Sequence, residues 1–249
     1  MSTTIAISGK GGSGKTTVAA MITRLLRSQS SGSVLAVDAD PNSCLGLTLG
    51  AEPATTIAQV REQARTKQPS EGGTDRIRSF EYEIQQAITE AAGFDLLTMG
   101  RPEGPSCYCA VNNILRQFLD KLSSQYGFVI IDNEAGMEHL SRRTTNNVDL
   151  LCIVAEQTPL GELTARRIFA LAKQLPISVN RIGIIWNRTD SLKKLDDIET
   201  FGCIPYDDAV LNAAMQGKTI FDLKENNSAL AAAKKILEQK LPKVKVGGF

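Results

Sequence analysis

Short apolar runs alternate with longer amphipathic segments along much of the chain. The continuous apolar runs predict buried β-strands over 5–7, 34–37, 94–99, 128–131, 150–155 and 182–186. Between them, apolar residues recur at helical spacing and predict helices after residue 14 and over 56–65, 81–91, 111–125, 159–175 and 227–240. Strands that alternate with helices in this way predict an α/β fold with a mostly parallel central sheet.

The first apolar run leads into the glycine-rich loop Gly9-Lys10-Gly11-Gly12-Ser13-Gly14-Lys15-Thr16, with Thr17 behind it. This loop fits the phosphate-loop pattern G-x-x-x-x-G-K-[ST], and it lies between a strand and a helix, as that motif requires. Its glycines allow backbone N–H groups to turn inward around phosphate oxygens, and the positive end of the helix points at the same anion. We expect Lys15 to reach the β- and γ-phosphates of ATP, and the Thr16 hydroxyl to bind Mg²⁺.

Carboxylates follow two of the predicted strands. Asp38 and Asp40 end the second strand, and Asp132 ends the strand over 128–131. The carboxyl ends of strands in open α/β sheets face the crevice where ligands bind. An apolar strand that ends in aspartate is the Walker B arrangement, so we expect Asp132 to act on the Mg²⁺ shell.

The composition limits the remaining possibilities. The 28 basic and 27 acidic residues nearly cancel, which gives no reason to expect nucleic-acid binding. No apolar run approaches the roughly 20 residues of a membrane span, and the first strand begins too early for a signal peptide. Five cysteines, an odd number, favour a reducing cytoplasm over a disulfide framework. We therefore expect one cytoplasmic domain over 1–249, with a basic tail over 241–249 that need not be ordered.

A cysteine pair, Cys107 and Cys109, follows the strand over 94–99 in a loop rich in glycine and proline. Residues i and i+2 of an extended segment face the same side, so both sulfurs can bind one ion. Thiolates suit zinc, nickel or copper(I) better than magnesium. A closed thiolate site normally has four ligands, and a two-fold dimer would supply the missing two. Taken alone, the pair also fits two unpaired thiols or a strained local disulfide.

Lys10 gives the loop the form G-K-G-G-x-G-K-T, which resembles the deviant Walker A ATPases: the Min and Par partitioning ATPases, the nitrogenase iron protein and metal-cluster assembly ATPases. The resemblance implies a three-layer P-loop NTPase fold with about seven or eight strands. It also implies an ATP-gated homodimer in which Lys10 crosses to the partner's nucleotide and acts with Lys15 on the developing charge. Asp40 would position the attacking water, Asp38 would have a supporting role near the loop and Mg²⁺, and Gly136 would sense the γ-phosphate. Glu134 is a second candidate for the water, so that assignment stays open.

The same resemblance places the base of the nucleotide. Asn187, which follows the strand over 182–186, is similar to the family's adenine-reading asparagine, and Arg188 comes next to it. Pro205, Tyr206 and Asp207 resemble the segment that lines the other side of the base, mostly through its backbone.

The sequence from Gly100 to Pro105, followed by Cys-Tyr-Cys and Asn112-Asn113, is similar to the CooC-type nickel-insertion ATPases of carbon monoxide dehydrogenase. Close relatives of these serve acetyl-CoA synthase. This resemblance implies that Ni²⁺ (or Zn²⁺) is held between two subunits by Cys107 and Cys109, and that an apo form of either enzyme is the client.

Two alternatives from other classes remain. A positioning ATPase like the Min and Par proteins would bind membrane or DNA, but the tail, with Lys240, Lys243 and Lys245 among few large apolar residues, is a poor membrane anchor. A redox ATPase like the nitrogenase iron protein would hold an iron–sulfur cluster between its subunits. That protein draws its cysteines from two separated loops and not from a C-x-C pair.

Overall fold

The computed structural model describes residues 2–27, 33–66, 73–101, 121–122, 124–134, 147–175 and 177–241. In these ranges eight strands form one sheet in the order β3-β4-β2-β5-β1-β6-β7-β8, and every neighbouring pair is parallel except β3 with β4. The strands are β1 (Thr3–Gly9), β2 (Val34–Ala39), β3 (Ile88–Ala91), β4 (Phe94–Thr98), β5 (Phe128–Asn133), β6 (Asn147–Ala155), β7 (Ser178–Asn187) and β8 (Glu199–Ile204). The predicted α/β class with a mostly parallel sheet is confirmed.

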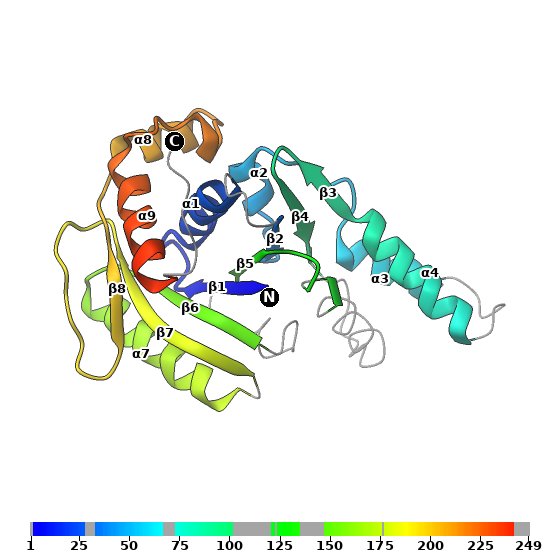
Figure 1. The fold of residues 1–249 in the computed structure, drawn as a ribbon, viewed down its shortest axis with the longest axis horizontal. Coiled ribbons are helices and arrows are strands. Elements are labelled where there is room, and N and C mark those ends of the chain that lie inside the picture. The colour runs from blue at the N-terminus through cyan, green and yellow to red at the C-terminus, as the bar shows by residue number, and fades with distance from the viewer. Residues whose placement is uncertain are drawn as a thin grey trace.

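Helices cover both faces of the sheet (Figure 1). They are α1 (Lys15–Arg27), α2 (Leu45–Leu49), α3 (Ile57–Thr66), α4 (Gly73–Gln86), α7 (Pro159–Gln174), α8 (Asp208–Met215), the 3₁₀ turn η1 (Ile220–Asp222) and α9 (Ser228–Lys240). One buried apolar cluster joins α1, α2, η1 and α9 to the sheet, and a second joins α3, α4 and α7 to the opposite face. The central strands are therefore buried on both sides, which is why they appear in the sequence as continuous apolar runs.

Each predicted strand is present, and the helices predicted after residue 14 and over 56–65, 159–175 and 227–240 correspond to α1, α3, α7 and α9. Most of the helix predicted over 111–125 lies outside the described residues. Sequence reasoning did not find β3, β8, α2 or α8. The two missed strands lie at the edges of the sheet, where polar and half-exposed side chains interrupt the apolar pattern.

The helix predicted over 81–91 is wrong in its second half. α4 ends at Gln86, and residues 88–91 form β3, which pairs antiparallel with β4. The two strands are joined by Ala92 and Gly93, and Gly93 has a φ of 86° in the left-handed region. Glycine adopts this conformation without Cβ strain, so it permits a two-residue turn between β3 and β4. The chain therefore forms a hairpin here and does not extend α4.

Arg24 connects α1 to η1 and the residue after it. Its side chain is buried, and Nη1 donates to the carbonyl oxygens of Ile220 at 2.6 Å and Leu223 at 2.9 Å. A buried charged donor that satisfies two carbonyls is worth more than a surface ion pair, because removing it deprives two buried acceptors of their partner.

We expect Arg24→Met to lower the free energy of unfolding by about 3 kcal/mol, since a methionine fills the space but donates no hydrogen bond. Urea unfolding followed by circular dichroism would measure this change. The matched control is Arg166→Met, which breaks a solvent-exposed ion pair with Asp197 and should cost less than about 1 kcal/mol. An equal decrease in the free energy of unfolding in the two variants would show that the buried hydrogen bonds of Arg24 stabilise the fold no more than an exposed ion pair does.

Candidate functional site

The glycine-rich loop joins β1 to α1 and encloses Lys15. The Lys15 side chain is only 6% exposed, and its Nζ donates to the carbonyl oxygen of Lys10 at 3.3 Å. That same carbonyl accepts the N–H of Ser13 at 3.2 Å, so the loop curls back towards the lysine. Gly14 has a φ of 92°, and a Cβ there would lie 2.3 Å from Nδ2 of Asn187. Only glycine fits such a position, and the result is a cationic cradle suited to phosphate groups.

Two carboxylates stand beside this loop at the ends of adjacent strands. The register pairs Asp38 of β2 with Asp132 of β5, and Asp132 with Ile7 of β1. Asp38 is fully buried and accepts the backbone N–H of Leu45 on Oδ2 at 2.8 Å and of Asp40 on Oδ1 at 3.3 Å. The structure thus brings Asp38, Asp132 and the phosphate loop together, as the sequence predicts.

The Asp132 carboxylate is fully buried, and neither oxygen has a hydrogen-bond partner in the described residues. Burial raises its pKa to about 7, the neighbouring Thr16 hydroxyl and the charge of Lys15 oppose this shift, and Asp38 adds to it. Burial also raises the pKa of Asp38 to about 6, against the hydrogen bond from Leu45. The positive charge beside these two carboxyl groups is therefore too small to offset their burial.

These oxygens fit a hard divalent cation. Mg²⁺ prefers carboxylate, hydroxyl and phosphate oxygens, and it keeps several of its own waters. The unpartnered oxygens of Asp132, the Thr16 side chain and the loop together offer such a donor set next to the expected phosphate position. When bound, Mg²⁺ would neutralise charge on the phosphate oxygens.

The residues proposed to handle the attacking water lie at the same edge. Asp40 is half-buried, and its Oδ1 accepts both the backbone N–H and the Nδ2 of Asn42 at 2.9 Å. Glu134 directly follows β5 and is also half-buried. Both follow strands that end at the loop side of the sheet, so the geometry leaves the choice between them open. Gly136 lies outside the described residues.

A cavity of about 530 Å³ adjoins the end of the loop and the start of α1. Gly14 and Thr17 form its inner wall, and the predicted base-binding residues Asn187, Arg188, Pro205, Tyr206 and Asp207 line it as well. The structure therefore brings these separate segments together, although they lie at the ends of β7 and β8 and far from the loop in sequence.

Asn187 connects this cavity to the phosphate loop. Its Nδ2 donates to the carbonyl oxygen of Ser13 at 2.8 Å, and the side chain is almost fully buried. This bond uses one of the two N–H groups of the amide, so Oδ1 remains able to accept a hydrogen bond from a ligand and the second N–H remains able to donate one. The exocyclic amino group of adenine is a suitable donor, whereas guanine carries an acceptor at the equivalent position.

Asp207 has a structural task that the sequence interpretation did not foresee. Its carboxylate caps α8 by accepting the N–H of Ala209, and it also accepts Nδ2 of Asn227 and Oγ of Ser228. The hydrogen bond from Ser228 is the main reason that its pKa is lowered. With these donors in place, Asp207 can contribute to the cavity mainly through its backbone.

The outer rim of the cavity was missed by sequence reasoning. It includes Leu47 of α2 together with Leu211 of α8, and both are exposed. α8 carries a recognisable start signal, an aspartate cap at Asp207 followed by apolar residues, which could have revealed it. α2 has only five residues and offers no such pattern.

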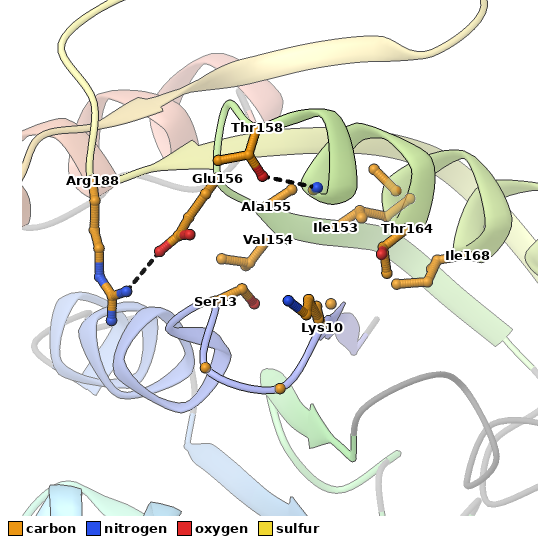
Figure 2. A pocket seen from close by; sticks show the side chains of 15 residues that line it. Lys10, Ser13, Ile153, Val154, Ala155, Glu156, Thr158, Thr164, Ile168 and Arg188 are labelled. Atoms are coloured by element: carbon orange, nitrogen blue, oxygen red, sulfur yellow. Dashed lines mark hydrogen bonds and ion pairs between the residues drawn. The ribbon is translucent and has the colours of Figure 1, made fainter.

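A second, smaller cavity of about 230 Å³ lies between the loop and the start of α7 (Figure 2). Lys10 and Ser13 line it on one side, and Thr158 caps α7 on the other by accepting the N–H of Gly161 at 3.0 Å. Arg188, whose φ of 60° is left-handed, lines both cavities. Its guanidinium donates to Glu156 at 2.7 Å.

The predicted thiolate ligands, Cys107 and Cys109, lie outside the described residues. In the ranges that the structure covers, Cys44, Cys152 and Cys203 are free thiols, and no three His, Cys, Asp or Glu side chains are grouped as a metal site. The helices of those ranges also lack the length and apolar character needed to span a bilayer.

The fold and this site define the class: a nucleotide-binding protein with a P-loop. Residues 4–220 match the CobQ/CobB/MinD/ParA nucleotide binding domain, and the chain belongs to this family.

Several relatives resemble the chain over nearly its whole length. An uncharacterized ATP-binding protein of Methanocaldococcus jannaschii is 37% identical, with 94% of this chain and 97% of the relative covered. The carbon monoxide dehydrogenase accessory protein CooC of Rhodospirillum rubrum is 33% identical over 92% of this chain and 95% of its own. Among solved structures, MinD of Pyrococcus horikoshii in complex with Mg-ADP has a TM-score of 0.66 at 22% identity, with 96% of each chain covered. That likeness supports the fold alone.

The two raised pKa values predict how stability depends on pH. A carboxyl group whose pKa is higher in the folded than in the unfolded state favours the fold most at low pH, below its unfolded pKa of about 4. That contribution is lost as the pH rises through 6 and 7, because the folded state must then bury negative charge. Without divalent cations, we expect the free energy of unfolding to fall by the order of a few kcal/mol between about pH 5 and pH 8.

Asp132→Asn should flatten this dependence, since the amide cannot ionise and no longer raises the pKa of Asp38. Urea unfolding in EDTA across the pH range would measure it, with Glu52→Gln on the surface as the control. Parallel curves for Asp132→Asn and the parent would contradict the assignment.

Proposed function

We propose that the chain is a Mg²⁺-dependent ATPase that acts as a homodimer and assists nickel delivery to carbon monoxide dehydrogenase or acetyl-CoA synthase. The observation that carries the ATPase part is the juxtaposition of a buried Lys15 with the unpartnered carboxylate of Asp132 beside a phosphate loop. Membership of the CobQ/CobB/MinD/ParA family supports nucleotide as the ligand. We further propose that residues 1–249 work as one ATPase domain.

The reaction is attack of water on the γ-phosphorus, in line with the bond to the β–γ bridging oxygen. The new P–O bond forms as that bridging bond breaks, and ADP leaves with its electron pair. Asp40, or Glu134 in its place, orients the water and accepts a hydrogen bond from it. Lys15 stabilises negative charge on the β- and γ-phosphate oxygens, and the N–H groups of the loop hold the same oxygens in place.

Lys10 is the residue that we assign to the dimer. Its side chain is exposed in the loop while its carbonyl oxygen accepts Nζ of Lys15. The two lysines of the loop therefore differ in their surroundings, since one is enclosed and the other is accessible to another molecule. This supports a role for Lys10 at the nucleotide of a second subunit.

The nickel part of the proposal rests on the sequence around Cys107 and Cys109 and on the similarity to CooC of R. rubrum, described as a carbon monoxide dehydrogenase accessory protein. One structural feature supports a link between the cysteine segment and the nucleotide. Met99, which precedes that segment, donates its N–H to the carbonyl oxygen of Asp38 at 2.8 Å. A displacement of the Asp38 backbone on nucleotide binding would therefore also displace Met99, which directly precedes the sequence from Gly100 to Cys109.

We expect Lys15→Ala to lower Mg²⁺-dependent phosphate release from ATP by at least about 100-fold, because the transferred phosphoryl group loses its fixed cation. A coupled phosphate assay would measure this. Lys235→Ala, a surface lysine of α9, removes the same charge far from the loop in sequence and should leave the rate within about twofold of the parent. Unchanged release in the Lys15 variant would remove the ATPase assignment.

We expect one Ni²⁺ ion per dimer, because each chain supplies two thiolates to a four-ligand site. Titration of reduced protein with Ni²⁺, followed by sulfur-to-nickel charge-transfer absorption, would give the endpoint. Cys107→Ser and Cys109→Ser should each abolish tight binding while ADP affinity stays within about twofold. The control Cys44→Ser removes an exposed thiol near Asp38 and should leave the endpoint unchanged. An endpoint of one ion per chain would place the metal elsewhere.

A further inference from the structure

Thr98, the last residue of β4, carries a buried hydroxyl that the proposed mechanism does not use. Its side chain is 1% exposed, and Oγ1 has no hydrogen-bond partner in the described residues. A buried hydroxyl that makes no hydrogen bond is unfavourable, so such groups are few in folded proteins and call for an explanation.

The sheet places Thr98 in line with the two carboxylates of the site. The register pairs Thr98 with Asp38, and Asp38 with Asp132. Paired residues of parallel strands direct their side chains to the same face, and adjacent strands lie about 4.8 Å apart. Two residues earlier, the same three strands contribute to the apolar cluster beneath α1 with Leu96, Ala36 and Ile130. The three polar side chains therefore continue that face at the carboxyl ends of the strands, with Asp38 in the middle.

Asp38 has room for another donor. An ionised carboxylate can accept about four hydrogen bonds, two on each oxygen. The backbone N–H groups of Leu45 and Asp40 take one position on each oxygen, and the bond from Asp40 is long at 3.3 Å. The backbone N–H of Gly46 also interacts with the carboxylate, which leaves one of the four positions open. Asp132 lies on one side of Asp38 and repels it when both carboxyl groups are ionised, whereas on the other side the Thr98 hydroxyl can donate to it.

The backbone around Thr98 is held firmly, so its hydroxyl occupies a defined position. The next residue, Met99, donates its N–H to the carbonyl oxygen of Asp38 at 2.8 Å and accepts the N–H of Ala58 at 2.9 Å. Gly100 follows with a φ of 70°, and it lies so close to Thr56 that a Cβ would come within 2.6 Å of the threonine hydroxyl. Both the strand end and the residues after it are thus fixed against β2 and the start of α3.

We infer that Thr98 is a positioning residue for the divalent cation: its hydroxyl donates to the Asp38 carboxylate, directly or through one water, when a cation binds between Asp38, Asp132 and the nucleotide. The inference rests on the proposed function, since it takes a metal–nucleotide complex as the ligand. Thr98 does not contact the cation. It holds the Asp38 carboxylate in one orientation while the cation is bound.

The test measures cation binding and not turnover. Mn²⁺ serves as the probe in the presence of saturating ADP, and the loss of the free Mn²⁺ signal in electron paramagnetic resonance gives its affinity. We expect Thr98→Val, which keeps the shape but removes the hydroxyl, to weaken Mn²⁺ binding by about tenfold. Thr98→Ser, which keeps the hydroxyl, should bind Mn²⁺ within about twofold of the parent. ADP affinity measured in EDTA should be the same in all three proteins.

The matched control is Thr23→Val on α1. Thr23 is also fully buried, but its hydroxyl donates to the carbonyl oxygen of Ala19, within its own helix. It should leave Mn²⁺ affinity unchanged. If Thr98→Val does not fold, Thr98→Ala provides the same loss of the hydroxyl.

A double-variant cycle tests the pairing with Asp38: in an Asp38→Ala background, which leaves no side-chain acceptor, Thr98→Val should have no further effect on Mn²⁺ affinity.

Parent-like Mn²⁺ affinity in Thr98→Val, or a Thr98→Ser variant as weak as Thr98→Val, would overturn the inference, because packing and not the hydroxyl would then be the cause. A parent protein that binds no Mn²⁺ with ADP would contradict the proposed function itself. The two failures are therefore distinguishable.

Discussion

The structure depends on how charge is buried at one edge of the sheet. Asp38 and Asp132 lie side by side on adjacent strands, and the ammonium group of Lys15 is enclosed by the loop next to them. A buried carboxylate is unfavourable unless it is hydrogen-bonded or faces a positive charge. Here the pair has fewer partners than it needs, and Asp132 has none in the described residues. The fold is therefore less stable at this edge than a fully paired one would be, and the proposed binding of a cation and phosphates would recover that stability.

The sequence predicts the central part of the fold because strands that are buried on both faces consist of continuous apolar residues, a pattern that is easy to identify. A strand such as 128–131 must be apolar at every position, whereas an edge strand need not be. β3 has the sequence Ile-Thr-Glu-Ala, which is equally compatible with a helix, and its pairing with β4 depends on the turn at Gly93. Local pattern therefore located the core strands and failed where tertiary pairing overrides propensity.

The same distinction applies to the candidate site: its individual motifs can be predicted from the sequence, but their arrangement in space cannot. The phosphate loop and the aspartates at the strand ends are local motifs, so each could be found from spacing alone. Their mutual positions depend on the strand order, in which β2 and β5 are neighbours although β3 and β4 lie between them in the sequence. No local pattern encodes that order. The same holds for Thr98, which the sheet places beside Asp38, and for Asp207, whose hydrogen bonds to the start of α9 become apparent only in three dimensions.

The hydrogen bond from Asn187 to the carbonyl oxygen of Ser13 has a consequence for how a nucleotide is recognised as a whole. One amide lines the cavity that we propose for the base, and it also hydrogen-bonds to the loop that we propose for the phosphates. In the proposed complex, the base and the phosphates of one nucleotide would therefore contact two segments that are joined by this hydrogen bond. Binding of either part would help to order the segment that binds the other. Adenosine or pyrophosphate, bound separately, would each have to offset the full entropy cost of ordering the loop and Asn187. The intact molecule gains from the connection, in the manner of two tethered ligands whose joint affinity exceeds that of either part.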